Sequence, residues 1–207
     1  MAAGKGTRMK SGLPKVLHRL GGIALLAHVI RCAEKMSARK AVVITGHGAT
    51  EVEAACAGMA SGLVPEFARQ EPQLGTGHAV QQALPLLADD GVTLVLSGDV
   101  PLTEVATLQA LVNECDGQRL ALLTLAMPDP TGYGRILRAG TQASAQVRAI
   151  VEHKDASDEQ RKINEIYSGI MAVPTRLLRS WLARLDNKNA QNEYYLTDIV
   201  KFAVADG

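Results

Sequence analysis

The chain has 207 residues, of which 47% are hydrophobic and 21% are charged, and its formal net charge is +1. This length suits one sizeable domain, and the composition is typical of a soluble globular protein. The small net charge excludes a general attraction to nucleic acid, and the lack of a long apolar run excludes a membrane-spanning segment. We therefore expect one domain over residues 1–207, with small-molecule substrates, no nucleic-acid partner and no membrane partner.

Hydrophobic spacing predicts that helices and strands alternate through residue 126. The predicted helices cover residues 23–36, 49–59, 76–88 and 103–115, the last with Thr103 as its N-cap. The predicted strands cover residues 41–45, 63–68, 92–97 and 120–126, and Pro65 demotes the second of them to an edge or irregular position. This order predicts an α/β fold: a Rossmann-like mixed, mostly parallel sheet with helices on both faces.

The pattern changes after residue 126, where turn formers become frequent. A hairpin is predicted from residues 135–138 and 146–151, and a capping box at residues 157–160. A strand is predicted over residues 166–173, followed by helices over residues 174–185 and 196–205. Pro174 suits the first turn of the helix that it opens. We find no repeat, low-complexity stretch or linker that would divide the chain.

The three cysteines, Cys32, Cys56 and Cys115, are widely spaced and odd in number. This pattern fits neither a zinc site nor a disulfide framework. We interpret the three side chains as reduced thiols in a cytoplasmic protein.

The opening segment, Met1-Ala-Ala-Gly-Lys-Gly-Thr-Arg-Met9, is the most informative part of the chain. Its glycines let the backbone approach a ligand closely, and Arg8 and Lys15 add positive charge beside it. The spacing matches neither the usual P-loop nor the dinucleotide motif. We interpret it as a site for nucleotide phosphates; the alternative is an ordinary terminus with accidental basic residues.

A carboxylate follows the clearest predicted strand, in Ser97-Gly98-Asp99-Val100-Pro101. Ligands of open α/β sheets bind beyond the carboxyl ends of strands, so Asp99 is placed to bind Mg²⁺ while the ligand's phosphates complete the metal's shell. The alternative is an aspartate in an ordinary turn.

Two further loops carry candidate binding residues. Gln70 offers a donor and an acceptor to a base edge, and Gly75 and Thr76 suit close backbone contact. Gly134 lies in a turn-rich segment, and Glu152 is a candidate acceptor for a sugar hydroxyl or amide. For Gly75 and Thr76 the alternative is a tight helix start, and for Gly134 it is an ordinary hairpin turn. For Gln70 and Glu152 the alternative is a solvated side chain.

Seven blocks of the chain, taken in order, resemble the uridylyltransferase domain of bacterial N-acetylglucosamine-1-phosphate uridylyltransferases. The blocks are residues 2–9, 14–15, 70–79, 98–102, 129–136, 150–155 and 193–198. The resemblance implies the nucleotide-diphospho-sugar transferase fold. It also implies Mg²⁺-dependent transfer of UMP from UTP to N-acetylglucosamine 1-phosphate. The products would be pyrophosphate and UDP-N-acetylglucosamine, a precursor of cell wall and lipopolysaccharide.

The resemblance also implies a role for each matching residue. Arg8, Lys15 and Asp99 would be catalytic, with Asp99 as the metal ligand. Substrates would be bound by Met1, Ala2, Ala3, Gly4, Lys15, Gln70, Gly75, Thr76, Ser97, Gly98, Gly134, Glu152 and Tyr167. Within this set the first four residues would meet the nucleotide, those of the 70–76 loop would read the uracil, and Gly134 and Glu152 would contact the aminosugar.

The chain departs from the family pattern at four points. Tyr167 stands where the family has an asparagine. The family's first strand, its second metal ligand (an asparagine) and its left-handed β-helix acetyltransferase domain have no counterpart in the sequence. We therefore expect a monomer, or a trimer if the acetyltransferase domain is also present. Two alternatives remain open: a nucleotidyltransferase for another sugar 1-phosphate, and an inactive fragment that binds a UDP-sugar.

Overall fold

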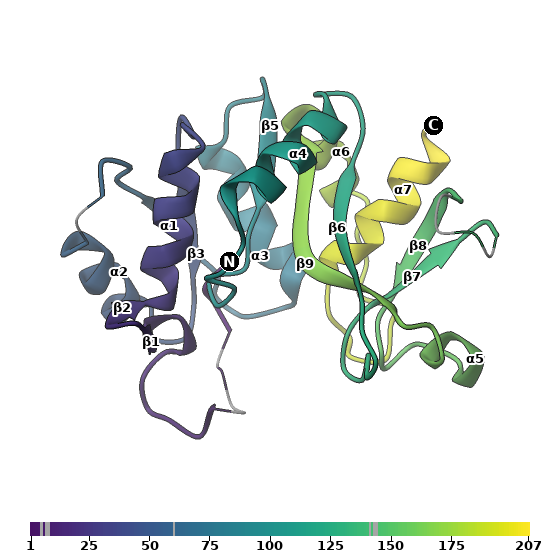
Figure 1. Cartoon of the computed structure of the whole chain (residues 1–207), viewed down its shortest axis with the longest axis horizontal. Helices are drawn as coiled ribbons and strands as arrows, with labels where there is room; N and C mark the ends of the chain where they lie inside the picture. The colour runs from purple at the N-terminus through teal and green to yellow at the C-terminus, as the bar shows by residue number, and fades with distance from the viewer. Residues whose placement is uncertain (5, 7–8, 60, 141, 143–144) are drawn as a thin grey trace.

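The computed structural model describes residues 1–4, 6, 9–59, 61–140, 142 and 145–207. The first part contains β1 (Arg19–Leu20), β2 (Ile23–Ala24), α1 (Leu25–Lys35), β3 (Val42–Thr45), α2 (Ala49–Ala57), β4 (Glu66–Arg69), α3 (Thr76–Ala83) and β5 (Val92–Val95), with 3-10 turns η2 (Lys15–Leu17) and η3 (Leu84–Leu86). The second part contains α4 (Val105–Cys115), β6 (Ala121–Ala126), β7 (Arg135–Arg138), β8 (Val147–Val151), α5 (Asp158–Arg161), β9 (Glu165–Pro174), α6 (Thr175–Leu182) and α7 (Ile199–Ala205), with η4 (Leu196–Asp198) before α7. Figure 1 shows α1 and α2 at one end of the molecule and the β7–β8 hairpin with α5 at the other.

The strands form a mixed arrangement in which β9 is central. β3 pairs with β4 in parallel, with Val42 opposite Glu66. β9 lies between β5 and β6 and is antiparallel to both, so those two strands run in the same direction (Figure 1). β7 pairs with β8 and meets β9 where Arg135 lies opposite Ile166. The predicted α/β class is confirmed, although the sequence did not indicate that β9 inserts between β5 and β6.

Helices cover both faces of β9, as predicted. Met171 and Val173 point to one face and pack with residues of α3 and α6. Ile170 and Ala172 point to the other face and pack with α4. Because successive side chains of a strand alternate between its faces, one strand serves two cores. Met171 and Val173 are fully buried, and burial of such a side chain stabilises a fold by roughly 1.5–3 kcal/mol.

The predicted helices are shorter in the structure, and for two of them the cause is visible. The helix expected over residues 23–36 begins at Leu25, because residues 23–24 pair with β1. The helix expected over residues 76–88 ends at Ala83 and is followed by a 3-10 turn that contains Pro85. Proline disfavours helical backbone at the residue before it and cannot donate an amide hydrogen bond, which accounts for the early end.

The helix ends test three capping predictions. The capping box is confirmed: the Ser157 side chain accepts from the Gln160 backbone, and the Gln160 side chain accepts from the Ser157 backbone. Thr103 is not the N-cap of α4, since Glu104 occupies that position without a side-chain cap. Pro174 is the N-cap of α6, one residue before its first turn, because β9 extends through it.

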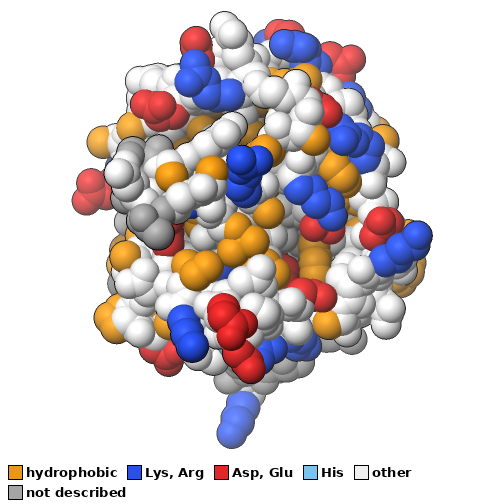
Figure 2. Space-filling view, turned by 90° about the vertical axis from the view of Figure 1, so that its right-hand side faces the viewer, with side chains coloured by type: hydrophobic (Ala, Val, Ile, Leu, Met, Phe, Trp, Pro, Cys, Tyr) orange, Lys and Arg blue, Asp and Glu red, His pale blue; other side chains and the backbone are white. Residues whose placement is uncertain are grey.

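The surface agrees with the balanced charge of the sequence. Figure 2 shows basic and acidic side chains interspersed among apolar ones on the end of the molecule that carries β7, β8 and α7. None of the described helices is both long and apolar enough to span a membrane. All three cysteines are free; Cys56 and Cys115 are buried, and Cys32 is half-buried.

Candidate functional site

The first three residues lie between the ends of β3 and β5. The Met1 ammonium donates to the Leu96 carbonyl over 2.6 Å, and the Met1 carbonyl accepts from the Gly98 amide over 2.9 Å. On the other side, the Ala2 amide donates to the Ile44 carbonyl over 2.8 Å. Ala2 and Ala3 are buried. The backbone predicted to meet a nucleotide is therefore fixed by strands on both of its sides.

Two glycines permit this close approach. A Cβ atom at Gly98 would lie 3.0 Å from the Met1 carbonyl oxygen, and one at Gly46 would lie 3.0 Å from the Ala3 carbonyl oxygen. Such distances are too short for ordinary packing, so a side chain at either position would displace the opening residues. Sequence reasoning assigned Gly98 to ligand contact, whereas its structural partner is Met1. Gly46 was not among the predicted binding residues, although its turn, Gly46-His-Gly48, was expected to lie at the strand ends with the other loops of the site.

The structure brings together two of the three predicted catalytic residues. Lys15, on η2, forms an ion pair with Asp99, on the turn after β5, and both side chains are partly exposed. The Met1 ammonium is nearby: burial lowers its pKa to about 6, and the charge of Asp99 acts in the opposite direction. Arg8 lies outside the described residues. A cation and a carboxylate thus meet beside the opening backbone.

Asp99 presents one carboxylate of the kind that divalent cations bind. Within the described ranges, no three His, Cys, Asp or Glu side chains converge on one point. Mg²⁺ usually binds through one or two carboxylates, keeps several waters and takes further oxygens from phosphates. The donor set at Asp99 therefore suits a metal that arrives with a phosphorylated ligand.

Gln70 is buried and organises its own loop. Its Nε2 atom donates to the Gly75 carbonyl over 2.8 Å and lies 3.2 Å from His78 Nδ1. Gly75 has a φ of +113°, and a Cβ there would lie 2.8 Å from the Tyr194 nitrogen. Only glycine tolerates both conditions. The structure thus gives Gln70 a loop-holding contact, and its reading of a base stays a prediction.

Thr76 joins this loop to the carboxyl-terminal segment. Its Oγ1 atom accepts from the Leu196 amide over 2.9 Å, and the Gly77 amide donates to the Tyr194 carbonyl over 2.7 Å. The Gln73 side chain also donates to the Ala3 carbonyl. The loop predicted to read uracil is therefore attached to the opening residues at one end and to η4 at the other.

Glu152 and Gly134 are neighbours, as the predicted sugar site requires. A Cβ at Gly134 would lie 2.8 Å from Ile150 Cγ2 and 3.7 Å from the Glu152 carboxylate. Thr197 Oγ1 donates to Glu152 Oε1 over 2.8 Å. Burial is the main cause that raises the pKa of Glu152, and the Thr197 hydrogen bond opposes it. Sequence reasoning missed Thr197, although it lies in a block that carried the family resemblance.

Tyr167 connects the sugar side to β9. Its backbone amide donates to the Gly134 carbonyl over 2.9 Å. Its phenol oxygen is buried and has no hydrogen-bond partner among the described residues. Burial, followed by the charge of Glu152, raises the pKa of the phenol far above its usual value, so the group stays protonated. Two residues further along the strand, the Gly169 carbonyl accepts from Ser97 Oγ over 3.5 Å.

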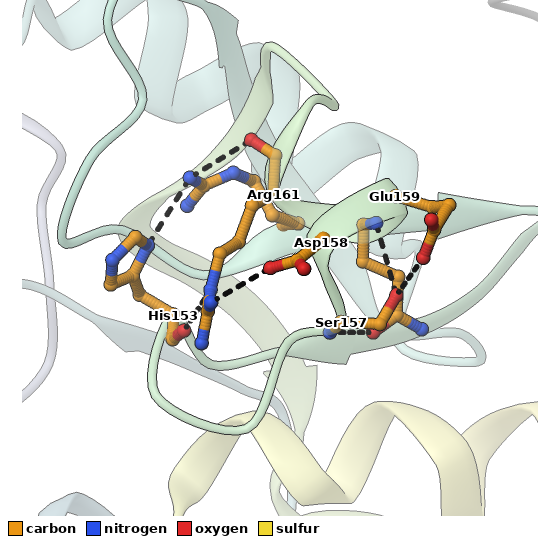
Figure 3. A network of polar contacts seen from close by, with 7 residues as sticks. His153, Ser157, Asp158, Glu159 and Arg161 are labelled. Atoms are coloured by element: carbon orange, nitrogen blue, oxygen red, sulfur yellow. Dashed lines mark hydrogen bonds and ion pairs between the residues drawn. The ribbon is translucent and has the colours of Figure 1, made fainter.

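A network of polar contacts holds the segment that follows Glu152. Arg135 is almost completely buried, and its guanidinium lies 3.3 Å from His153 Nδ1 and donates to the Arg161 carbonyl over 3.3 Å. Figure 3 shows the Arg161 side chain beside the His153 carbonyl, to which its Nε donates over 3.4 Å, and paired to Asp158 at 3.2 Å. No role was predicted for Arg135 from the sequence, because arginine side chains are mostly exposed.

These contacts connect the described candidate residues to one another in a continuous series that returns to its starting point. From Ala3 it passes through Gln73 to Thr76, and then through η4 to Glu152. Glu152 lies near Gly134, whose carbonyl accepts from the Tyr167 amide of β9. Gly169 of β9 accepts from Ser97, and the next residue, Gly98, donates to Met1. Loops that are far apart in the sequence are therefore linked by a continuous chain of contacts.

Comparisons with known proteins agree with this arrangement. Residues 1–166 match the MobA-like NTP transferase domain family. The chain is 81% identical over 210 residues to "Bifunctional protein GlmU" of Polaromonas naphthalenivorans and 66% identical over 210 residues to that of an Acidovorax species. All of this chain is covered in both comparisons, but only 44% of each relative, so the chain spans less than half of their length.

Solved structures confirm the fold. The chain superposes on a UDP-glucose pyrophosphorylase complexed with UDP-glucose with a TM-score of 0.76, over 100% of this chain and 85% of the other, at 16% identity. An apo-UDP-glucose pyrophosphorylase gives a TM-score of 0.70 over 97% of this chain and 84% of the other, also at 16% identity. The predicted nucleotide-sugar transferase fold is therefore observed.

Proposed function

Because this chain belongs to the MobA-like NTP transferase domain family, we propose that it is a sugar-phosphate nucleotidyltransferase. Its substrates are UTP and N-acetylglucosamine 1-phosphate, and its products are UDP-N-acetylglucosamine and pyrophosphate. The choice of reaction is supported by relatives named bifunctional protein GlmU, at up to 81% identity. The structural observation that carries the proposal is the Lys15–Asp99 ion pair beside the strand-fixed opening residues.

In the proposed reaction, a phosphate oxygen of the sugar phosphate attacks the α-phosphorus of UTP in line. The bond from this phosphorus to the bridging oxygen breaks, and pyrophosphate leaves with the electron pair. The attacking oxygen is already ionised at neutral pH, so no protein base is needed. Positioning and charge neutralisation then account for the rate, as in other phosphoryl transfers.

The basic residues neutralise the phosphates. Lys15 exchanges its ion pair with Asp99 for a phosphate oxygen when the nucleotide binds. Arg8, which lies outside the described residues, adds a second positive charge. Asp99 would hold Mg²⁺, which supplies further positive charge to the phosphate oxygens when bound. Preorganised charge of this kind typically contributes a hundredfold or more in rate per group.

At the other side of the site, Glu152 and Tyr167 contact the aminosugar. Thr197 donates to one carboxylate oxygen of Glu152, so the remaining acceptor capacity of this carboxylate is available to a sugar hydroxyl or amide. The Tyr167 phenol is a buried donor that lacks a described partner, and a sugar oxygen would satisfy it once the side chains that cover the phenol move aside.

The test is pyrophosphate release from a panel of nucleoside triphosphates and sugar 1-phosphates, with and without Mg²⁺. We expect release with UTP and N-acetylglucosamine 1-phosphate, and far less with other pairs. Release with glucose 1-phosphate instead would replace the proposed sugar. Binding of UDP-N-acetylglucosamine without turnover of any pair would contradict the enzymatic proposal and favour a binding module.

A further inference from the structure

The hairpin of β7 and β8 has its open end at the proposed sugar site. At that end the last pair of the ladder joins Arg135 to Val151. Because the two strands are antiparallel, the same register places Gly134 opposite Glu152 one step beyond this pair. Both residues are expected to contact the aminosugar, and a Cβ at Gly134 would lie 3.7 Å from the Glu152 carboxylate. The pair that faces the sugar therefore lies just past the end of the strand ladder.

The Arg135 side chain bridges this open end. Its Nη1 atom donates to the Tyr133 carbonyl, and its Nη2 atom lies 3.3 Å from His153 Nδ1. Since a guanidinium carries donors only, the histidine nitrogen is the acceptor. Tyr133 immediately precedes Gly134, and His153 immediately follows Glu152. One side chain thus joins the two strand ends on the far side of the residues expected to contact the sugar.

A third contact ties the bridge to α5. Nη2 of Arg135 also donates to the Arg161 carbonyl over 3.3 Å, and Arg161 Nε donates to the His153 carbonyl over 3.4 Å. The planar guanidinium presents its donors in fixed directions, so one group reaches acceptors on three segments of the chain. A lysine ammonium is a single point of donation and does not reproduce this fork.

This position is energetically unfavourable for an arginine. Arg135 is only 1% exposed, and its partners are two carbonyls and a histidine nitrogen, none of them an anion. Its Nε atom is buried and has no hydrogen-bond partner within the described part of the chain. A buried cation without a paired anion destabilises a fold, and buried donors are rarely left without a partner. Departures of this kind are expected where a site requires a particular geometry.

We propose that Arg135 is a positioning residue, whose guanidinium holds Gly134 and Glu152 at the separation that the aminosugar requires. Its donors are directed at protein groups, so it acts through its neighbours and does not itself contact the substrate. Without the bridge, local opening separates the strand ends and moves the Glu152 carboxylate away from Gly134. The kinetic consequence rests on the proposed function, whereas the structural role of the bridge does not.

Steady-state kinetics with UTP and N-acetylglucosamine 1-phosphate tests the positioning role. Arg135→Lys keeps the charge but loses the fork, so we expect KM for the sugar phosphate to rise about tenfold, the scale of one weakened hydrogen bond. Both kcat and KM for UTP should stay within about twofold of the wild type, because the nucleotide side of the site is unchanged. The matched control is Arg138→Lys on the same strand, which weakens the forked pair with Glu165 and should leave all three constants unchanged. Equal rises in both KM values, or equal changes in the two arginine variants, would overturn the proposal.

A second pair of variants removes the acceptor and keeps Arg135, so it tests the bridge even where Arg135→Lys folds poorly. His153→Ala should raise KM for the sugar phosphate in the same way, because one arm of the bridge is lost. His153→Gln should restore most of the lost affinity, since its amide oxygen can accept from the guanidinium. Identical KM values for the sugar phosphate in the two His153 variants would count against the bridge.

Amide exchange in the free protein separates the bridge from the reaction. The Asp155 and Ala156 amides each donate to the Glu152 carbonyl over 3.0 Å, so their exchange reports on the segment that carries Glu152. We expect both amides to exchange at least about tenfold faster in Arg135→Lys than in the wild type or in Arg138→Lys. Faster exchange in a chain whose wild type does not turn over the sugar phosphate would refute the proposed function and support the bridge. Unchanged exchange, whatever the activity, would overturn the inference itself.

Discussion

Lys15 and Asp99 form an ion pair between the segment that follows the opening loop and the turn that follows β5. The two residues are 84 positions apart in the sequence, yet both lie next to the strand-fixed amino terminus. Both side chains are partly exposed, so the pair contributes little to stability, typically 0–1 kcal/mol. In the proposed function, ligand phosphates and a cation separate the two groups.

Removing the Asp99 carboxylate should abolish most of the activity while leaving the fold intact. We expect Asp99→Asn to lower kcat/KM for pyrophosphate release by about a hundredfold or more, the scale for losing one electrostatic group. The same loss is expected for Arg8→Ala. The matched control is Asp90→Asn, which breaks the exposed Arg39–Asp90 pair. Near-normal turnover in both Asp99→Asn and Arg8→Ala would refute the assigned roles.

Lys15 is expected to act on phosphate charge rather than on folding. Lys15→Met should lower kcat/KM about a hundredfold, because the phosphate loses a preorganised cation. Lys40→Met, which breaks the exposed Lys40–Glu66 pair, should leave kcat/KM within about twofold. Urea unfolding should detect less than about 1 kcal/mol of difference in either variant. Equal kinetic losses in the two lysine variants would show that Lys15 has no special role.

Removing the Tyr167 hydroxyl should raise the stability of the free protein and weaken its binding of the sugar phosphate. Tyr167→Phe removes a buried hydroxyl that lacks a partner in the described part of the chain, so the free protein should be stabilised by about 1 kcal/mol. If the phenol donates to the sugar, KM for the sugar phosphate should rise severalfold and KM for UTP should not change. A variant with unaltered KM for both substrates would remove Tyr167 from the sugar site.

Glu152 should make stability fall as pH rises. Its pKa is raised in the folded state, chiefly by burial, so the native protein binds the proton more tightly than the unfolded chain does. Protonation therefore stabilises the fold at low pH, and this contribution is lost as pH rises from the unfolded value of about 4.5 through the folded value. Glu152→Gln should be more stable than the wild type at pH 7, and the difference should shrink toward pH 4. Urea unfolding of both proteins at each pH measures it; a constant difference would contradict the burial argument.

Gly75 should tolerate no side chain. Gly75→Ala combines a φ of +113° with a Cβ only 2.8 Å from the Tyr194 nitrogen, so we expect a loss of about 3 kcal/mol or more in the free energy of unfolding. Gly117→Ala is the matched control, since its φ is also positive, at +64°, but a Cβ there meets no atom within 4 Å. The control should lose only about 1–2 kcal/mol. Equal losses of stability in the two variants would mean that the Tyr194 backbone moves aside for the added Cβ at little cost.

The sequence was sufficient for most elements because their signals are local. The strand at Val42–Thr45 and the capping box at Ser157 depend on neighbouring residues alone, and both are observed. The place of β9 depends on which strands it meets, and its apolar run is equally compatible with a parallel or an antiparallel partner. Its insertion between β5 and β6 was therefore beyond sequence reasoning.

The candidate site shows the same contrast between local signals and contacts that are distant in the sequence. Gln70, Gly75 and Glu152 could be proposed as binding residues because residue type and loop position together indicate binding, and their contact with substrate stays a prediction. Thr197 and Arg135 act through partners that are distant in the sequence, Glu152 and His153 respectively. A threonine at the start of a helix and an arginine in a strand carry no signal of such partners.

A crystal structure of the chain with UDP-N-acetylglucosamine and Mg²⁺ tests the central claim most directly. The account predicts nucleotide density on the backbone of residues 1–4, phosphates between Lys15 and Asp99, and the sugar against Glu152 and Tyr167. Nucleotide bound elsewhere, with the Lys15–Asp99 ion pair still intact, would contradict it.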